Sequence, residues 1–452
     1  MSIFKKFVHS DIYIILMTAL GFLIWYFQPD ISISAGIVFV AANFLLFTQK
    51  DSNGLLYLFL IMAVSNVAGN NVNLGSLDII LTQPNILLTL LLIIILVVEL
   101  LLFFIFRFKK QNRTSLWIGF ALLAVSFAIS GVRQNGMVYE SFRYIDTIMM
   151  GLVIFLFLFF AFTIDKNSKR YICKCLLYLG AYIAIQIFTF YFVVSIKYPH
   201  LLYELRPSLV WGNGNAAALV ILLAFPAGGY LYAHKPNFFY FFLTRVSFIG
   251  ILASTSRGGI IAGIVAVLLT DIFARLKMKD HHKYNLVYFG SIALILSLLV
   301  INLEELKPFV EFIVQRFLSD GDLNDYSSGR IDLYKQAIQL FLENPITGVG
   351  TSLAVLYNVT PWFHSTLFDT LAATGIIGTT MMGVHMFQKY RLLIKNRKDT
   401  FVVFVFIGFI SSGLYGMIDV AYYNLIWLMI FAIVLACVEV QTKVETLTSL
   451  NQ

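Results

Sequence analysis

The chain has 452 residues, of which 59% are hydrophobic and only 12% are charged. Soluble domains carry about 25% charged residues, so this composition excludes an ordinary soluble protein. Apolar runs of about 17–25 residues recur along the sequence, and each is long enough to cross a bilayer as a helix. The net charge of +8 does not indicate a nucleic-acid partner, because most basic residues lie between the apolar runs. The run at 87–106 is continuously apolar rather than alternating, which disfavours a membrane β-barrel.

The sequence predicts an all-α polytopic membrane bundle of about 12–14 transmembrane helices, forming a single domain over residues 1–452. Lys5 and Lys6 precede the first apolar run as in a signal peptide, but no small-residue cleavage site follows, so we interpret the run as the first helix. Residues 238–274 can form either two helices or one broken element. Fourteen helices are expected, with twelve as the alternative, at residues 12–27, 31–48, 54–69, 86–106, 115–131, 145–164, 171–196, 215–233, 238–255, 258–274, 285–302, 364–387, 400–417 and 420–438.

The basic residues alternate between the two sides of this predicted bundle. With a cytoplasmic N-terminus, the cytoplasmic connections contain clusters at 107–113, 166–174, 275–283 and 389–398, whereas the outer connections contain few basic residues. This distribution follows the positive-inside rule and predicts that both termini are cytoplasmic in a bacterial cell membrane.

The longest connection, residues 303–363, is expected on the outer side as a small helical cap. Residues 303–318 place apolar side chains at helical spacing. Residues 330–343 form an amphipathic pattern with Pro345 just beyond its end. The apolar side chains that this pattern places on one helix face are Ile331, Tyr334, Ile338 and Phe341.

Three residues on the predicted outer side are candidates for chemistry. Arg257 precedes two glycines and opens a helix, where a planar guanidinium and free N–H groups suit a phosphate. Arg330 opens the amphipathic helix, although a cation there opposes the helix dipole. His364 begins the next apolar segment and can accept a proton near neutral pH. Each residue also has a structural explanation: Arg257 as an interfacial anchor, Arg330 as the partner of Asp332, and His364 as an ordinary interfacial histidine.

Weaker candidates lie on the same side. Arg206 precedes Gly212-Asn213-Gly214-Asn215, where Asn215 can bind sugar hydroxyls, although helix capping is the ordinary role of such residues. Asp419, near the outer end between the last two helices, can orient a base or pair with a cation. No zinc-binding, nucleotide-binding or serine-hydrolase motif occurs in the sequence, and no metal or cofactor is expected.

Several short segments resemble the O-antigen ligase and Wzy-type polysaccharide polymerase superfamily. They occur in order between about residues 211 and 378, and the earlier helices match only as a membrane topology. The matching segments are Gly212-Asn213-Gly214-Asn215-Ala216, Thr255-Ser256-Arg257-Gly258-Gly259, Ser328-Gly329-Arg330, Glu343-Asn344-Pro345-Ile346-Thr347-Gly348-Val349-Gly350, His364-Ser365 and Gly375-Ile376-Ile377-Gly378. Ser365 departs from the pattern, since the family often has Asn there.

The resemblance implies a metal-independent, inverting glycosyltransferase that uses a glycan carried on undecaprenyl pyrophosphate. By the same resemblance, Arg257 and Arg330 hold the pyrophosphate, and His364 helps to activate the hydroxyl of an acceptor glycan. We expect the lipid bilayer as a further partner, and flippase and chain-length regulator proteins as candidate ones. Arg206 and Asn215 are weaker candidates for substrate binding.

Three functions remain to be distinguished. A polymerase of a capsule, exopolysaccharide or O-antigen is favoured, because the family occurs widely in organisms without lipopolysaccharide. An O-antigen ligase would transfer the same glycan to a lipid A-core acceptor. A lipid-linked oligosaccharide flippase or transporter would instead place charged sites near the midplane of the membrane. Arg245, which lies within a predicted span, is the one residue that favours a transporter.

Overall fold

The computed structural model describes residues 3–65, 85–109, 114–132, 140–201, 205–209, 211–278, 281–301, 329–350, 363–422 and 424–449, with single positions at 304, 307, 311 and 314. These residues form helices and one isolated bridge between Ser208 and Asn213. The helices are α1 (Ile3–Val8), α2 (Asp11–Phe27), α3 (Ile31–Thr48), α4 (Asn53–Ala63), α6 (Ile86–Arg107), α7 (Trp117–Val132), α8 (Glu140–Thr163), α9 (Lys169–Lys197), η2 (Pro199–Leu201), α10 (Gly214–Ala224), α11 (Ala227–His234), α12 (Phe238–Ala253), α13 (Arg257–Lys277), α14 (His281–Ile301), α17 (Arg330–Glu343), α19 (Thr366–Lys395), α20 (Thr400–Gly416) and α21 (Leu425–Ser449).

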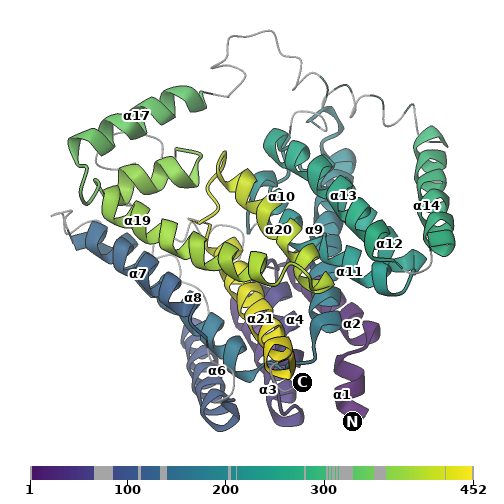
Figure 1. Ribbon diagram of the computed structural model, residues 1–452, viewed down its shortest axis with the longest axis horizontal. Helices are drawn as coiled ribbons and strands as arrows, with labels where there is room; N and C mark the ends of the chain where they lie inside the picture. Colours follow the sequence, from purple (N-terminus) through teal and green to yellow (C-terminus); the bar gives the residue numbers. More distant parts are fainter. Residues whose placement is uncertain are drawn as a thin grey trace.

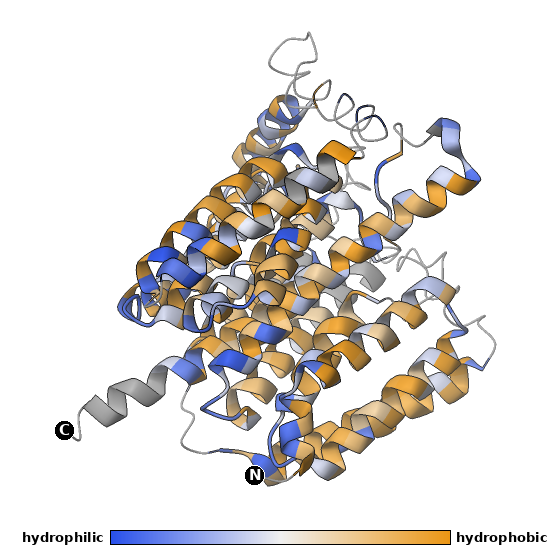
Figure 2. Cartoon of the chain, turned by 90° about the vertical axis from the view of Figure 1, so that its right-hand side faces the viewer, coloured by the Kyte–Doolittle hydropathy of each residue, from blue (hydrophilic) through white to orange (hydrophobic). Residues whose placement is uncertain are grey.

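The helices confirm an all-α polytopic membrane bundle. Seven helical segments in the described ranges are long and apolar enough to cross a bilayer, namely α3, α6, α9, α10 with α11, α13, α19 and α21. Shorter apolar helices lie in α2, α4, α7, α8, α12 and α20. With α14, these helices correspond one to one with the fourteen predicted segments. Figure 2 shows hydrophobic residues along the helices and hydrophilic residues gathered mainly at their ends.

Residues 238–274 form two helices, as predicted, because the chain turns at Ser254–Ser256 and α13 then begins at a serine cap. Other predicted boundaries were wrong. The segment predicted at 215–233 is interrupted between α10 and α11, where Pro226 removes a backbone donor. Helix α19 continues well beyond the predicted end at residue 387 and buries Lys389, which the hydropathy pattern had placed in a connection.

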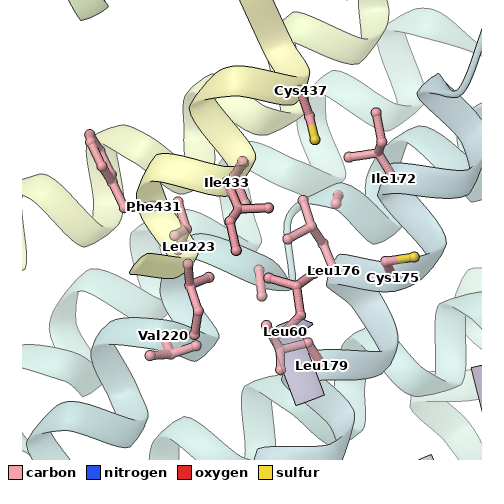
Figure 3. Close-up of a cluster of buried hydrophobic side chains, with 14 of the residues drawn as sticks. Leu60, Ile172, Cys175, Leu176, Leu179, Val220, Leu223, Phe431, Ile433 and Cys437 are labelled. Atoms are coloured by element: carbon pink, nitrogen blue, oxygen red, sulfur yellow. The ribbon is translucent and has the colours of Figure 1, made fainter. Parts of the chain in front are cut away.

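The centre of the bundle is a continuous apolar core built by α4, α9, α10, α20 and α21. Figure 3 shows part of this core, where side chains such as Leu176, Leu223 and Ile433 meet. Glycine allows a close helix contact in the core. A Cβ at Gly408 of α20 would lie 2.4 Å from the carbonyl oxygen of Leu223 in α10. The two helix backbones therefore touch, and this contact fixes the middle of α20 relative to the end of α10.

A buried ion pair joins α12 and α13. The guanidinium of Arg245 binds both carboxylate oxygens of Asp271 at 2.6 and 2.7 Å, and its Cζ lies 4.2 Å from the ring centroid of Phe241. Tyr232 donates a further hydrogen bond to Asp271 at 3.2 Å. Arg245 is thus neutralised within the bundle and has a structural role, since breaking a buried pair leaves an uncompensated charge.

The two ends of the bundle differ. Both termini lie at one end, where ion pairs tie distant segments together: Lys5 binds Asp51 at 3.0 Å and Asp165 at 2.8 Å, and Lys174 binds Asp11 at 3.0 Å (Figure 1). Helix α17 lies at the opposite end (Figure 1).

Helix α17 packs on the first part of α19 and forms the expected cap. Its bounds agree with the predicted residues 330–343, but the predicted apolar face was partly wrong, because Ile338 is 44% exposed. The cap has a small core of its own, formed by Ala337, Leu340, Val349, Phe363 and Ala372. The helix predicted at 303–318 lies mostly outside the described residues.

Replacing Gly408 with Ala should weaken the α10–α20 contact. The added methyl group meets a backbone carbonyl that cannot rotate away, and such overpacking costs about 1–3 kcal/mol of unfolding free energy. Thermal unfolding of the purified protein in detergent should show a lower Tm. Gly36→Ala is the control, because no atom lies within 4 Å of its added Cβ. Equal Tm values for the two variants would contradict this description of the core.

Candidate active site

Helix α13 begins at the same end of the bundle as the cap, with Arg257 as its first residue. The chain turns at Thr255, whose φ is 57°, and the Ser256 hydroxyl accepts a hydrogen bond from the Gly259 N–H at 3.3 Å. A Cβ at Gly258 would lie 2.5 Å from a side-chain carbon of Ile418 and 2.8 Å from the Tyr415 ring. This close packing fixes the N-terminus of α13, and Arg257 with it, against the end of α20.

Arg330 is the first residue of α17, and its side chain reaches the end of α20. Its guanidinium donates a hydrogen bond to the carbonyl oxygen of Ile418, just beyond the C-terminus of α20. A helix C-terminus carries partial negative charge, which favours a cation there. The dipole of α20 therefore compensates for the unfavourable position of Arg330 at the start of its own helix.

His364 lies between the cap and the bundle. Its ring nitrogen Nδ1 is 3.7 Å from Oδ1 of Asp419, which is an ion-pair distance and too long for a hydrogen bond. The His364 side chain is 41% exposed, so a substrate can reach it, whereas that of Asp419 is only 13% exposed.

The backbone around His364 is held in an uncommon conformation. Its φ is 51°, in a backbone region that residues other than glycine rarely adopt. Such conformations are often found at functional sites. Tyr334 of α17 donates a hydrogen bond to the His364 carbonyl at 3.3 Å, and the Thr366 N–H donates to the Asp419 carbonyl at 3.1 Å. These two contacts, one on each side, keep the ring directed at the Asp419 carboxylate.

The carboxylate of Asp419 is ionised within this site. It accepts hydrogen bonds from the Tyr415 hydroxyl at 2.9 Å and from the Val420 N–H at 2.8 Å. Burial acts to raise the pKa of Asp419, but the neighbouring His364 together with these two donors and the charge of Arg330 hold it below its usual range. Asp419 therefore presents a negative charge to His364 at neutral pH.

The cap is joined to the bundle at a break in α19. Gly375 has non-helical backbone angles with φ of 61°, and the segment at residues 345–350 enters the break. The N–H groups of Val349 and Gly350 donate to the carbonyls of Ala372 and Ala373 at 2.8 Å each. On the far side of the break, the Ile376 N–H donates to the Pro345 carbonyl at 2.8 Å. Two segments that were noted separately in the sequence are therefore one structural joint.

The weaker candidates, Arg206 and Asn215, lie close to the start of α13, at the edge of the candidate site. Gly214 is packed against the Ser254 carbonyl, with no room for a side chain, and Pro207 lies beside it. The cap of α10 is Asn213, whose side chain accepts the N–H of Asn215 at 3.1 Å. Arg206 is exposed and Asn215 is partly buried, so both remain candidates for contacts with the substrate.

The structure brings the start of α13 at Arg257–Gly258, the Arg330 guanidinium and the His364 ring close to residues 415–419, although these three residues are far apart in the sequence. Sequence reasoning missed the contributions of Tyr415 and Tyr334, because no local signature distinguishes them from other interfacial tyrosines. Asp419 was noted only as a weaker candidate. Among the described residues, no three His, Cys, Asp or Glu side chains gather as a metal site would require.

Comparison with known proteins gives one family match, over the part of the chain that contains the candidate residues. Residues 242–383 match the family model described as O-antigen ligase, a segment that contains Arg257, Arg330 and His364. No curated protein matches the chain. The chain is thus an all-α polytopic membrane protein that carries an O-antigen ligase family domain. This match supports the resemblance of the sequence segments to the O-antigen ligase and Wzy-type superfamily, whose members are glycosyltransferase-like enzymes.

Substituting Gly375 with Ala should detach the cap from the break in α19. A Cβ there would lie 2.5 Å from the Ile346 carbonyl oxygen, at a φ that alanine disfavours. We expect faster proteolysis within residues 329–350 and loss of function, with the protein still present in the membrane. Gly383→Ala in the same helix is the control, because its Cβ meets nothing within 4 Å. Identical digestion patterns for the two variants would contradict the joint.

Proposed function

We propose that this protein is a glycan polymerase of a cell-surface polysaccharide such as a capsule, exopolysaccharide or O-antigen. It transfers a glycan from undecaprenyl pyrophosphate to a hydroxyl group of an acceptor glycan. The observation that carries the proposal is the convergence of two arginines and one accessible histidine on residues 415–419.

The chemistry assigned to each residue follows from its position. The acceptor oxygen attacks the anomeric carbon while the bond from that carbon to the pyrophosphate oxygen breaks, and the leaving pyrophosphate takes the bonding electrons. Arg257, Arg330 and the N–H groups at the start of α13 stabilise the charge that develops on the pyrophosphate. His364 accepts the proton of the acceptor hydroxyl, and the Asp419 carboxylate stabilises the resulting imidazolium. A single displacement of this kind inverts the anomeric centre and uses fixed cations in place of a metal.

The distribution of charge supports an outward-facing site. The basic clusters at residues 107–113 and 275–283 mark the cytoplasmic side by the positive-inside rule, and α17 lies at the end of the bundle opposite the termini (Figure 1). We therefore propose a bacterial cytoplasmic membrane enzyme with both termini inside. Lipid-linked units would then be delivered by a flippase, and chain-length regulators are further candidate partners.

The ligase alternative uses the same chemistry with a different acceptor, and the matched family model is compatible with both roles. The flippase alternative has less support. Arg245, the one charge that favoured a transporter, is paired with Asp271 and packed against aromatic rings.

Removal of any of the three central side chains should abolish glycan transfer. We expect Arg257→Ala, Arg330→Ala and His364→Ala each to lower the rate by at least about 100-fold, the usual loss when one group that stabilises the transition state is deleted. The amount of protein in the membrane should stay unchanged. Arg275→Ala is a matched control, because it removes the same side chain at the opposite end of α13. Normal long-chain polymer from all three site variants would refute the proposed site.

The acceptor can be identified with the purified protein and a defined lipid-pyrophosphate repeat unit. A polymerase should produce a ladder of products without any second acceptor. A ligase should produce nothing until a lipid A-core acceptor is added. If lipid moves between leaflets and no glycosidic bond forms in either reaction, the protein is a transporter and the proposed function is wrong.

A further inference from the structure

A continuous line of hydrogen bonds connects the start of α13 with Asp419. The Ser256 hydroxyl lies 2.7 Å from the Tyr415 hydroxyl, which lies 2.9 Å from Oδ2 of Asp419. The other carboxylate oxygen, Oδ1, accepts the Val420 N–H and faces His364. The two oxygens of one carboxylate therefore have separate partners.

The direction of these hydrogen bonds is determined by the two ends of the line. An ionised carboxylate only accepts, so the Tyr415 hydroxyl donates to Asp419. The single hydroxyl proton of Tyr415 is then used, and Ser256 must donate to Tyr415. The Ser256 oxygen in turn accepts the Gly259 N–H at 3.3 Å, as the cap of α13. Each group thus has one possible role as donor or acceptor. The chain of hydrogen bonds connects the helix that begins at Arg257 with Asp419, which faces His364.

We propose that Tyr415 is a positioning residue that fixes the Asp419 carboxylate against His364 and couples it to the helix end carrying Arg257. This inference rests on the proposed function and names a residue on α20, outside the matched family segment, that its chemistry requires. A carboxylate held only through Oδ1 can rotate about its side-chain bonds, and its orientation toward His364 is then lost. The donation of Tyr415 to Oδ2 removes that freedom.

Burial makes the hydroxyl of Tyr415 important. The residue is only 2% exposed, and its ring packs beside Gly258, so water has little access to replace its hydrogen bonds. Hydrogen bonds to charged groups are stronger than neutral ones, and an ionised acceptor that loses a buried donor is destabilised. Tyr415 therefore keeps the Asp419 carboxylate ionised as well as turned toward His364.

The other charged groups near His364 allow a clear pH test. Asp419 faces the ring from the α20–α21 connection, Asp369 lies one turn along α19, and Arg330 lies across from it on α17. The Tyr334 hydroxyl donates to the His364 carbonyl rather than to the ring. Without the Tyr415 donor, the Asp419 carboxylate can turn away from His364, and the proton that the ring accepts during transfer loses part of its counter-charge. Loss of the Asp419 charge acts in the same direction and more strongly.

The test compares pH–rate profiles of the purified full-length enzyme with its lipid-pyrophosphate donor. Tyr415→Phe, which keeps the ring and removes the hydroxyl, should lower kcat about ten- to hundredfold, the loss expected for one hydrogen bond to a charged group. KM for the donor should change less than about twofold, because both arginines remain in place. The acid limb of the profile should move to lower pH in Tyr415→Phe and further in the same direction in Asp419→Asn.

Two further variants keep the test decisive. Tyr422→Phe is the matched control, because Tyr422 is also buried, at 3% exposed, but its hydroxyl lies 3.4 Å from Lys389 rather than near the site. It should retain the wild-type rate and profile. Ser256→Ala removes the donor to Tyr415 and should move the acid limb in the same direction as Tyr415→Phe. This second variant answers the question if Tyr415→Phe does not fold.

The outcomes separate the two claims. If the wild-type enzyme transfers glycan but Tyr415→Phe behaves like Tyr422→Phe, the positioning role is wrong and the proposed function stands. If Tyr415→Phe is slower but the acid limb of its pH–rate profile does not move, Tyr415 acts only in folding or packing. This result also overturns the positioning role. A wild-type protein that forms no glycosidic bond with any acceptor overturns both.

Discussion

The site depends on one buried carboxylate. An ionised carboxylate away from water is unfavourable unless donors and a counter-charge surround it. The groups around Asp419 come from separate parts of the chain: Tyr415 from α20, Arg330 from the cap and His364 from the segment that enters α19. Tyr415 supplies a hydrogen bond from the bundle, and Arg330 and His364 add positive charge from the cap side, so the carboxylate favours the meeting of cap and bundle at this short connection.

Much of the fold could be predicted from the sequence, because lipid permits few alternatives. Backbone groups in a bilayer must be satisfied within the helix, so long apolar runs predict helices well. The errors occurred where polar residues are buried by neighbouring helices. Lys389 interrupts the apolar pattern, yet it lies inside α19, 4.3 Å from the ring centroid of Tyr390. The apolar face of α17 was misjudged at Ile338, which is 44% exposed, because the buried side of the helix is centred on Ala337 and Leu340, and helical spacing alone does not reveal this.

The site was predictable as a set of residues and not as an arrangement. Arg257, Arg330 and His364 stand in short sequence segments that carry a family resemblance, and the matched segment contains all three. Tyr415 and Asp419 lie outside that segment. The residues next to them in the sequence form no recognisable motif. Their importance follows from the close approach of α13 at Gly258, which only the folded chain shows. The break in α19 at Gly375 likewise joins two segments that the sequence presents as unrelated.

The central claim is that Arg257 and Arg330 form the two sides of one pyrophosphate site beside His364. A cryo-EM structure of the full-length protein with undecaprenyl pyrophosphate bound tests this claim most directly. The account predicts density for the two phosphates between the guanidinium groups, in contact with the N-terminus of α13 and within reach of His364. Phosphate density at another place, such as beside the buried pair of Arg245 and Asp271, would contradict it.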